Sequence, residues 1–154
     1  MKDGLPVEPD QATALVDLAR SATLCNEGEL LRRDGGWAWH GDPTDVALLT
    51  MAYKLGWRKE DTDELHPQVN DIPFEPERQF AATFNRHDDA LRVHVKGAPE
   101  QLLTHCNTQW QDNELIDFAA EPLLQEVEKL ASEGYRVLAF GKREFNSLPD
   151  IDNP

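Results

Sequence analysis

The pentapeptide Lys-Gly-Ala-Pro-Glu at 96–100 constrains the fold of this chain most. It follows an alternating run at 90–95 that is typical of a strand, and it opens a helix-like run at 99–105. Gly97 has no side chain, so a ligand can approach the backbone closely there. Pro99 suits the first turn of a helix, where free backbone N–H groups favour anions. The sequence therefore predicts a strand-to-helix corner suited to an anionic ligand.

Size and charge exclude several classes of function. A chain of 154 residues, 40% of them hydrophobic, suits one domain with a real core. Its net charge of −14 argues against a general nucleic-acid binder and against docking on an anionic membrane surface. An anionic ligand would be repelled by this overall charge, so its binding requires a local cluster of cations together with ring stacking.

Signals for membrane insertion or export are missing from the sequence. No apolar run approaches the roughly 20 residues of a membrane span, and the N-terminal residues lack a hydrophobic signal core. The two cysteines, Cys25 and Cys106, form neither a disulfide framework nor a spaced metal motif. A reduced cytosolic environment is the simplest setting, although a disulfide between the two remains open.

The pattern of apolar residues and turn residues predicts an α+β fold. Helices are expected at about 10–22, capped by Asp10, and at 43–55, 99–105 and 122–132. Strands are expected at 29–33, 37–40, 69–74, 79–86, 90–96 and 136–145, and loops at 58–67 and 107–113. Because the short hairpin turns argue against an all-parallel sheet, we expect a mostly antiparallel sheet flanked by helices. Residues 1–154 are expected to form a single domain with its core at about 10–145.

Phe74 and Asp45 each allow a structural and a functional interpretation. Phe74 follows a predicted strand, so it is either a core aromatic or an exposed ring that stacks on adenine. Asp45 lies three residues after the helix cap Asp42, so it is either a capping-box carboxylate or an acceptor for the adenine amino group.

Basic residues near the expected corner are candidates for phosphate contacts. Lys96 ends a strand, where lysines are usually solvated, but its ammonium can reach a phosphate or a ring edge. Arg136 begins the last predicted strand among apolar and aromatic neighbours, where its donors suit phosphate. Arg78 is a weaker candidate, because it lies in an ordinary charged turn. We expect Glu100 only to complement the dipole of its helix.

Several other chemistries lack a signature in this sequence. The five histidines show no paired ligand spacing, so no metal site is predicted. The chain has no Walker-type phosphate loop, no dinucleotide glycine fingerprint and no nucleophile elbow. Trp37 and Trp39 alternate in a predicted strand and are expected to pack against the protein rather than to form a binding platform.

Taken together, the motifs resemble the nucleotide-binding domain of cation-transporting P-type ATPases. They are more similar to the calcium and sodium/potassium class than to heavy-metal pumps. The order and spacing of the segments, rather than any one of them, carry this resemblance, which spans about residues 10–145. The matching segments lie at 24–26, 41–48, 73–74, 96–100 and 135–139.

The resemblance implies an ATP-binding site made of Asp45, Phe74, Lys96, Gly97, Ala98 and Arg136, with Asp42, Arg78 and Gln79 as secondary candidates. Phe74 would stack on adenine, Lys96 and Gly97 would line its pocket, and Arg136 would reach toward the phosphates. Two positions depart from the family. The family usually has glutamate at the position of Asp45. It often has lysine at the position of Gln79, so a cation for the phosphates is lost here unless Arg78 replaces it.

The resemblance also implies a role within a larger protein. The phosphorylated-aspartate motif and transmembrane helices of these pumps are not in this sequence. The chain is therefore expected to be a cytoplasmic domain of an integral membrane pump, with the phosphorylation and actuator domains as partners. It would bind ATP, as Mg-ATP in the parent protein, without hydrolysing it, and would make no direct contact with membrane or nucleic acid.

Two alternatives to this function remain open from the sequence. The first is a non-catalytic interaction domain whose acidic surface binds a basic partner, and the net charge of −14 supports it. The second is a free-standing hydrolase that uses an aspartate or histidine, although no nucleophile–base arrangement is identifiable.

Overall fold

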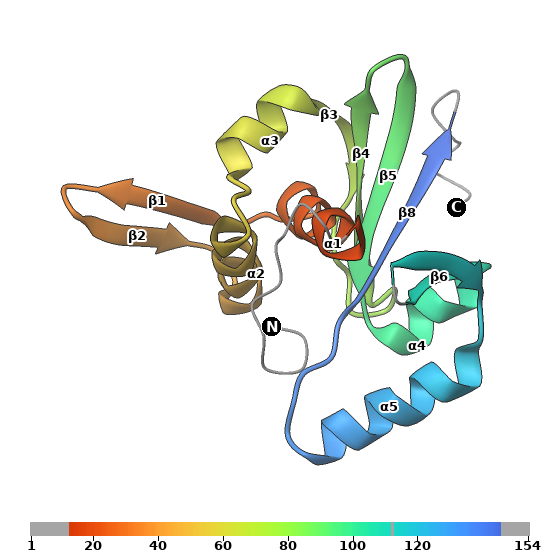
Figure 1. The fold of residues 1–154 in the computed structure, drawn as a ribbon. Helices are drawn as coiled ribbons and strands as arrows, with labels where there is room; N and C mark the ends of the chain where they lie inside the picture. Colours follow the sequence, from red (N-terminus) through yellow and green to blue (C-terminus); the bar gives the residue numbers. More distant parts are fainter. Residues whose placement is uncertain (1–12, 112, 146–154) are drawn as a thin grey trace.

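A four-stranded antiparallel sheet forms the centre of the computed structural model, which describes residues 13–111 and 113–145 (Figure 1). The strand order is β3-β4-β5-β8. These strands span Gln68–Ile72, Phe80–His87, Ala90–Gly97 and Ala139–Phe145. The predicted α+β class with a mostly antiparallel sheet is confirmed.

Two separate hairpins flank the sheet. The first joins β1 (Glu29–Arg33) to β2 (Gly36–His40) and projects away from the body of the protein (Figure 1). The second joins β6 (Thr108–Gln111) to β7 (Glu114–Asp117). Trp37 and Trp39 on β2 are 51% and 62% exposed, so the prediction that both are packed is wrong.

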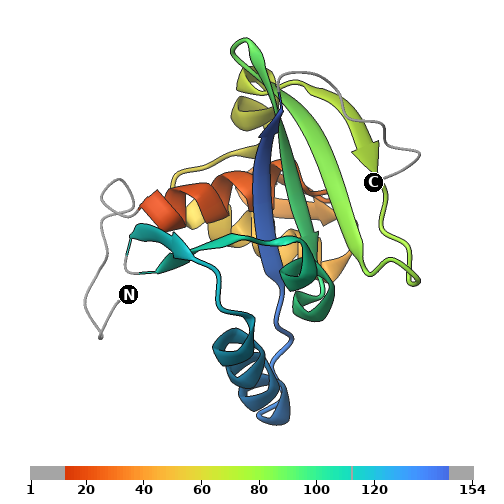
Figure 2. The same cartoon turned by 90° about the vertical axis from the view of Figure 1, so that its right-hand side faces the viewer.

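The helices lie before and between the strands. Their bounds are Thr13–Leu24 for α1, Pro43–Lys54 for α2, Lys59–Leu65 for α3, Pro99–Leu102 for α4 and Ala120–Ser132 for α5, and a 3₁₀ turn, η2 (Leu103–His105), follows α4. α1 crosses one face of the sheet in both views, whereas α5 lies beyond the end of the sheet (Figure 1, Figure 2). No helix in the described ranges is long and apolar enough to cross a membrane.

Helix α2 begins as its sequence predicts. Asp42 has an extended backbone, and its Oδ1 accepts a hydrogen bond from the backbone N–H of Thr44 at 2.8 Å. Pro43 occupies the first helical position, where its missing N–H costs nothing. The cap fixes the place at which α2 starts, and this start forms one wall of the site described below. The cap that the sequence predicts at Asp10 lies outside the described residues.

The two faces of the sheet differ in polarity. One face carries an apolar cluster of Ala82, Phe84 and Val93, with Ile72, Val95 and Phe145 packed against it. The opposite face meets α1 through polar groups: Ser21 Oγ lies 2.9 Å from His94 Nδ1, and Lys142 forms an ion pair with Asp17. His94 is only 1% exposed, so this interface buries a titratable ring.

The burial of His94 predicts that acid weakens the fold. Burial, reinforced by the charges of Arg92 and Arg20, lowers the pKa of His94 from 6.5 to about 3. Below pH 6.5 this histidine is protonated in the unfolded chain but stays neutral in the folded protein. Protonation therefore favours the unfolded chain, so the free energy of unfolding is highest above pH 6.5 and decreases as the pH falls toward 3. Between pH 7.5 and 5.5 we expect the free energy of unfolding to fall about 1 kcal/mol more than in a His94→Gln variant. Urea unfolding of both proteins measures this difference, and equal losses would contradict it.

Two segments that were predicted to be loops contain a helix or a strand. Residues 58–67 are not all loop, because Lys59–Leu65 form α3. Its acidic first turn suits a helix N-terminus, and Lys59 pairs with Asp63 one turn later at 3.3 Å. Residues 107–113 are not all loop either, since β6 lies there and pairs with β7. Both segments are mostly polar and contain one large apolar residue each, Leu65 and Trp110, so they lack the apolar periodicity by which helices and strands are predicted.

The last strand also begins later than predicted. Its first paired residue is Ala139, opposite Gly97 at the end of β5. Residues 136–138 extend past the end of β5, and none of the described strands pairs with them. Arg136 therefore lies in an extended segment before β8 rather than at a strand start.

Candidate functional site

A large pocket lies at the end of the sheet where β5 meets α4. Its volume is about 880 Å³, within the range of ligand pockets. Five parts of the chain supply its walls: the segment after α1, the start of α2, strands β3 to β5 with their loops and the start of α4, helix α5, and the segment before β8. Segments distant in sequence thus meet at one cavity.

The pocket brings together most of the residues that the sequence singles out. Asp45, Phe74, Lys96, Gly97, Ala98 and Arg136 all line it, as do Asp42 and Gln79. Arg78 does not line it. Its guanidinium lies 3.4 Å from Glu75 and sits over the ring of Phe80 at 5.9 Å, so it is engaged elsewhere.

Phe74 lies in the loop between β3 and β4. Its side chain is 57% exposed, although the ring borders the pocket. The interpretation of Phe74 as a core aromatic is therefore wrong. An exposed phenyl ring at a pocket rim presents a face on which a flat ring system can stack.

Lys96 and Asp45 form an ion pair in the wall of the pocket. The two side chains are only 13% and 12% exposed. The second carboxylate oxygen of Asp45 accepts a hydrogen bond from the backbone N–H of Glu27 at 3.2 Å. Asp45 thus joins the start of α2 to β5 and to the segment after α1, a contact that a capping box alone does not explain.

Asn26 holds the same corner in place, a role that the sequence analysis does not predict. Its Nδ2 donates to the carbonyl oxygens of Asp45 and Ala22, each at 3.0 Å, and its Oδ1 accepts from the N–H of Gly28 at 2.8 Å. In the sequence, Leu24-Cys25-Asn26 stands out only as one of the segments that match the family. A buried asparagine directly after a helix is the signal for such a role.

Gly97 is required by the packing of the protein itself. A Cβ at this position would lie 2.5 Å from the carbonyl oxygen of Gln79 and 2.5 Å from Cβ of Phe80. Gln79 has a left-handed backbone with φ of 60°, and its carbonyl accepts a hydrogen bond from the N–H of Ala98 at 2.9 Å. The space left by the missing side chain is thus partly filled by β4, and Gly97 also borders the pocket.

Arg136 lies close to the start of α2. Its Nη1 donates to Oγ1 of Thr44 at 3.2 Å. Hydrogen bonds from Thr44 lower the pKa of Asp42, and the charge of Arg136 lowers it further. The exposed Asp42 carboxylate therefore stays ionised beside the guanidinium, which reduces the positive charge available there to an anionic ligand.

Reactive groups in the pocket are few. Cys25 lines it, but burial raises the pKa of the thiol to about 11, so the thiolate nucleophile is scarce at neutral pH. Cys25 and Cys106 are both free thiols. Within the described ranges, no three histidine, cysteine or acidic side chains are placed to hold a metal ion.

Helix α5 contributes to the pocket in a way the sequence did not indicate. Val127 and Ala131 line the cavity opposite the sheet, and Glu100 of α4 lies on its border. The apolar face of α5 was expected from its periodicity, but a single-sequence pattern cannot show which cavity an amphipathic helix will face.

The fold and this cavity define an α+β domain that encloses a ligand-sized pocket at one end of an antiparallel sheet. More particularly, the chain belongs to the family described as P-type ATPase, cytoplasmic domain N, whose model matches residues 14–153. The resemblance seen in the sequence is confirmed.

Similar proteins carry matching names. "Cation-transporting ATPase pma1" of Synechocystis is 36% identical over 143 residues, which cover 92% of this chain and 15% of that protein. "Probable cation-transporting ATPase F" of Mycobacterium tuberculosis is 38% identical over 150 residues, covering 96% and 16%. "Calcium-transporting ATPase 1" of Lactococcus lactis is 31% identical over 132 residues, covering 80% and 14%. The chain thus spans about one sixth of the length of these relatives.

Proposed function

We propose that the pocket binds ATP, so that an aspartate on another domain of a cation pump can receive the γ-phosphate. The observation that carries this proposal is the exposed ring of Phe74 at the rim of a pocket lined by Lys96, Gly97 and Ala98. In this arrangement adenine stacks on Phe74, and the Lys96–Asp45 pair faces the polar edge of the base. Arg136 reaches toward the phosphates.

The charges around the pocket support binding that is driven mainly by the base. The ammonium of Lys96 is neutralised by Asp45, and the guanidinium of Arg78 is paired with Glu75. Gln79 supplies no charge where the family often has lysine. Arg136 is thus left as the principal cation of the pocket for phosphate. We therefore expect loss of the γ-phosphate to weaken binding less than loss of adenine.

The proposal extends to the parent protein. Its ATP would be bound as Mg-ATP, and its phosphorylation and actuator domains would be the partners of this one. Phosphoryl transfer depends on positioning and charge stabilisation, so this domain would deliver the nucleotide rather than perform the chemistry. The domain would then lie on the cytoplasmic side of an integral membrane protein and would be inactive as a hydrolase by itself.

A Phe74→Ala variant tests the proposed stacking. Removal of the ring should weaken ATP binding by roughly 1–3 kcal/mol, because that is the usual contribution of base–aromatic stacking. Isothermal titration calorimetry measures the affinity, and circular dichroism checks that the fold is retained. Trp110→Ala is the matched control, since it removes a partly exposed aromatic side chain that does not line the pocket. Unchanged ATP affinity in the Phe74 variant would reject the stacking role.

A further inference from the structure

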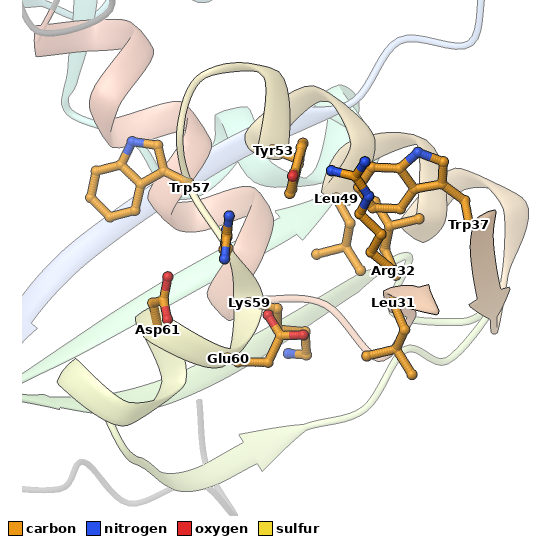
Figure 3. A pocket seen from close by; sticks show the side chains of 11 residues that line it. Leu31, Arg32, Trp37, Leu49, Tyr53, Trp57, Lys59, Glu60 and Asp61 are labelled. Carbon is orange, nitrogen blue, oxygen red and sulfur yellow. The ribbon is translucent and has the colours of Figure 1, made fainter. Parts of the chain in front are cut away.

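A second cavity, of about 340 Å³, lies between the β1–β2 hairpin and helices α2 and α3 (Figure 3). Trp37, Tyr53 and Trp57 form much of its wall, together with the aliphatic side chains of Leu31 and Leu49. None of these residues borders the large pocket described above. The two cavities therefore have separate walls.

The aromatic rings of this second cavity already have cationic neighbours. The guanidinium of Arg58 lies 5.7 Å from the ring centre of Tyr53, and that of Arg20 lies 5.1 Å from the ring of Trp57. The rings of Trp37 and Tyr53 contact each other edge to face, with ring centres 4.8 Å apart. An external cation would have to displace these arginines, so the cavity is poorly suited to one.

Two arginines place positive charge on this cavity from different elements, Arg32 from β1 and Arg58 from the start of α3. Across residues 13–111 and 113–145, neither Arg32 nor Arg58 forms an ion pair with an acidic side chain. Lys59 is engaged, because its Nζ contacts Asp63 and the carbonyl oxygen of Asn26. Two exposed guanidinium groups beside tryptophans are unusual on a chain with a net charge of −14.

The acidic lining residues fix the side on which an anion can bind. Glu60 and Asp61 belong to α3, whereas Arg32 and Trp37 extend from the hairpin side of the cavity (Figure 3). On the α3 side Glu60 and Asp61 offset the charge of Arg58, so carboxylates of a ligand would be attracted mainly on the hairpin side, where Arg32 lies. An elongated ligand must therefore place its negative charge along the hairpin and an apolar group between the rings.

We propose that this cavity binds an extended segment of a partner protein that carries a large apolar side chain flanked by carboxylates. The inference is independent of the proposed ATP binding. A protein segment suits the site better than a small molecule because the apolar surface continues beyond the cavity. Trp39 is 62% exposed and lies on the same side of β2 as Trp37, two residues along the strand. Tryptophan and arginine are the residues most enriched where a few side chains dominate binding.

The location of the cavity also favours docking of a segment. Among the strands in residues 13–111 and 113–145, β1 and β2 pair only with each other, so no described strand occupies the outer edge of either. A two-stranded hairpin is marginally stable in water by itself. A segment that contacts the hairpin and α2 together would bury the exposed tryptophans and hold the hairpin against the body.

Indole NMR signals of the whole chain test this docking site with a defined probe. The chain has four tryptophans and therefore four indole N–H signals. Addition of the acidic peptide acetyl-GEFDEG-amide should shift the signals of Trp37 and Trp57 and leave that of Trp110 in place. The basic peptide acetyl-GKFKKG-amide should cause smaller shifts. Saturating ATP should leave the peptide affinity unchanged, which separates this proposal from nucleotide binding.

Two neighbouring arginines provide a matched pair of variants. Arg32→Gln should weaken binding of the acidic peptide about tenfold. Arg33→Gln removes the same charge from the next residue, whose side chain points to the other side of β1 and does not line the cavity, so it should change binding less than twofold. Both variants should unfold at the wild-type urea concentration. Equal losses in the two variants, absent indole shifts, or tighter binding of the basic peptide would each overturn the proposal.

Discussion

A Gly97→Ala variant is expected to be less stable than the wild type by about 3 kcal/mol. The added Cβ would lie 2.5 Å from the carbonyl oxygen of Gln79 and 2.8 Å from Cα of Phe80. Both are backbone atoms, so they cannot move aside as the end of a long side chain can. β4 and β5 would have to separate where they are hydrogen-bonded, and the N–H of Ala98 would lose its alignment with Gln79.

Thermal unfolding measures this effect against a control on the same sheet. A loss of this size should lower the midpoint of unfolding by about 6–12 °C. Gly141 on β8 has no atoms within 4 Å of an added Cβ, so Gly141→Ala should leave the midpoint unchanged or slightly raised. If Gly97→Ala unfolds at the wild-type temperature, the tight approach of β4 to Gly97 is not present in solution.

Sequence reasoning predicted the main architecture because local signals there agree with tertiary structure. The cap at Asp42 and the proline after it mark the start of α2, and the turn near 87–89 marks the β4–β5 hairpin. The junction at 96–100 becomes the end of β5 and the start of α4, as expected from its glycine and proline. Each of these signals depends on the backbone requirements of one or two residues, which can be read without knowing the fold.

The contacts between distant segments could not be predicted in the same way. Lys96 and Asp45 were each identified as site residues, but nothing in their separate neighbourhoods indicates that they pair with each other. The reason for Gly97 was also different from the one expected, since the nearest atoms belong to β4. α3 was missed because its helix is stabilised by charged residues and one buried threonine, Thr62, rather than by an apolar stripe.

Exposure was the property that the sequence predicted least well. Phe74 and Trp37 are aromatic residues in or next to strands, and such residues are usually buried on one face. Both are more than half exposed here, the first in a loop and the second on a separate two-stranded hairpin, where its ring contacts Tyr53 of α2 at one edge. Whether a second layer covers a strand is decided by topology, which the alternation of residues along one strand does not encode.

Replacement of Lys96 by methionine is expected to cost about 3 kcal/mol of folding free energy. Methionine keeps the length and the apolar stem of the side chain but removes the ammonium, so the nearly buried carboxylate of Asp45 loses its counter-charge. Its remaining hydrogen bond from the N–H of Glu27 cannot offset the cost of a desolvated negative charge. Urea denaturation of the variant and the wild type at pH 7 measures the difference.

A second change separates the cost of the unpaired charge from the loss of packing. In the double variant Lys96→Met with Asp45→Asn, no unpaired charge remains, so most of the stability lost in Lys96→Met should return. Lys129→Met is the exposed control: its partner Glu126 is 58% exposed, and removal of that ion pair should change stability by less than about 0.5 kcal/mol. If the double variant is no more stable than Lys96→Met alone, packing rather than charge explains the loss. Since the double variant also removes both charges from the proposed adenine edge, its ATP affinity should stay low while its fold recovers, which distinguishes the two roles of this pair.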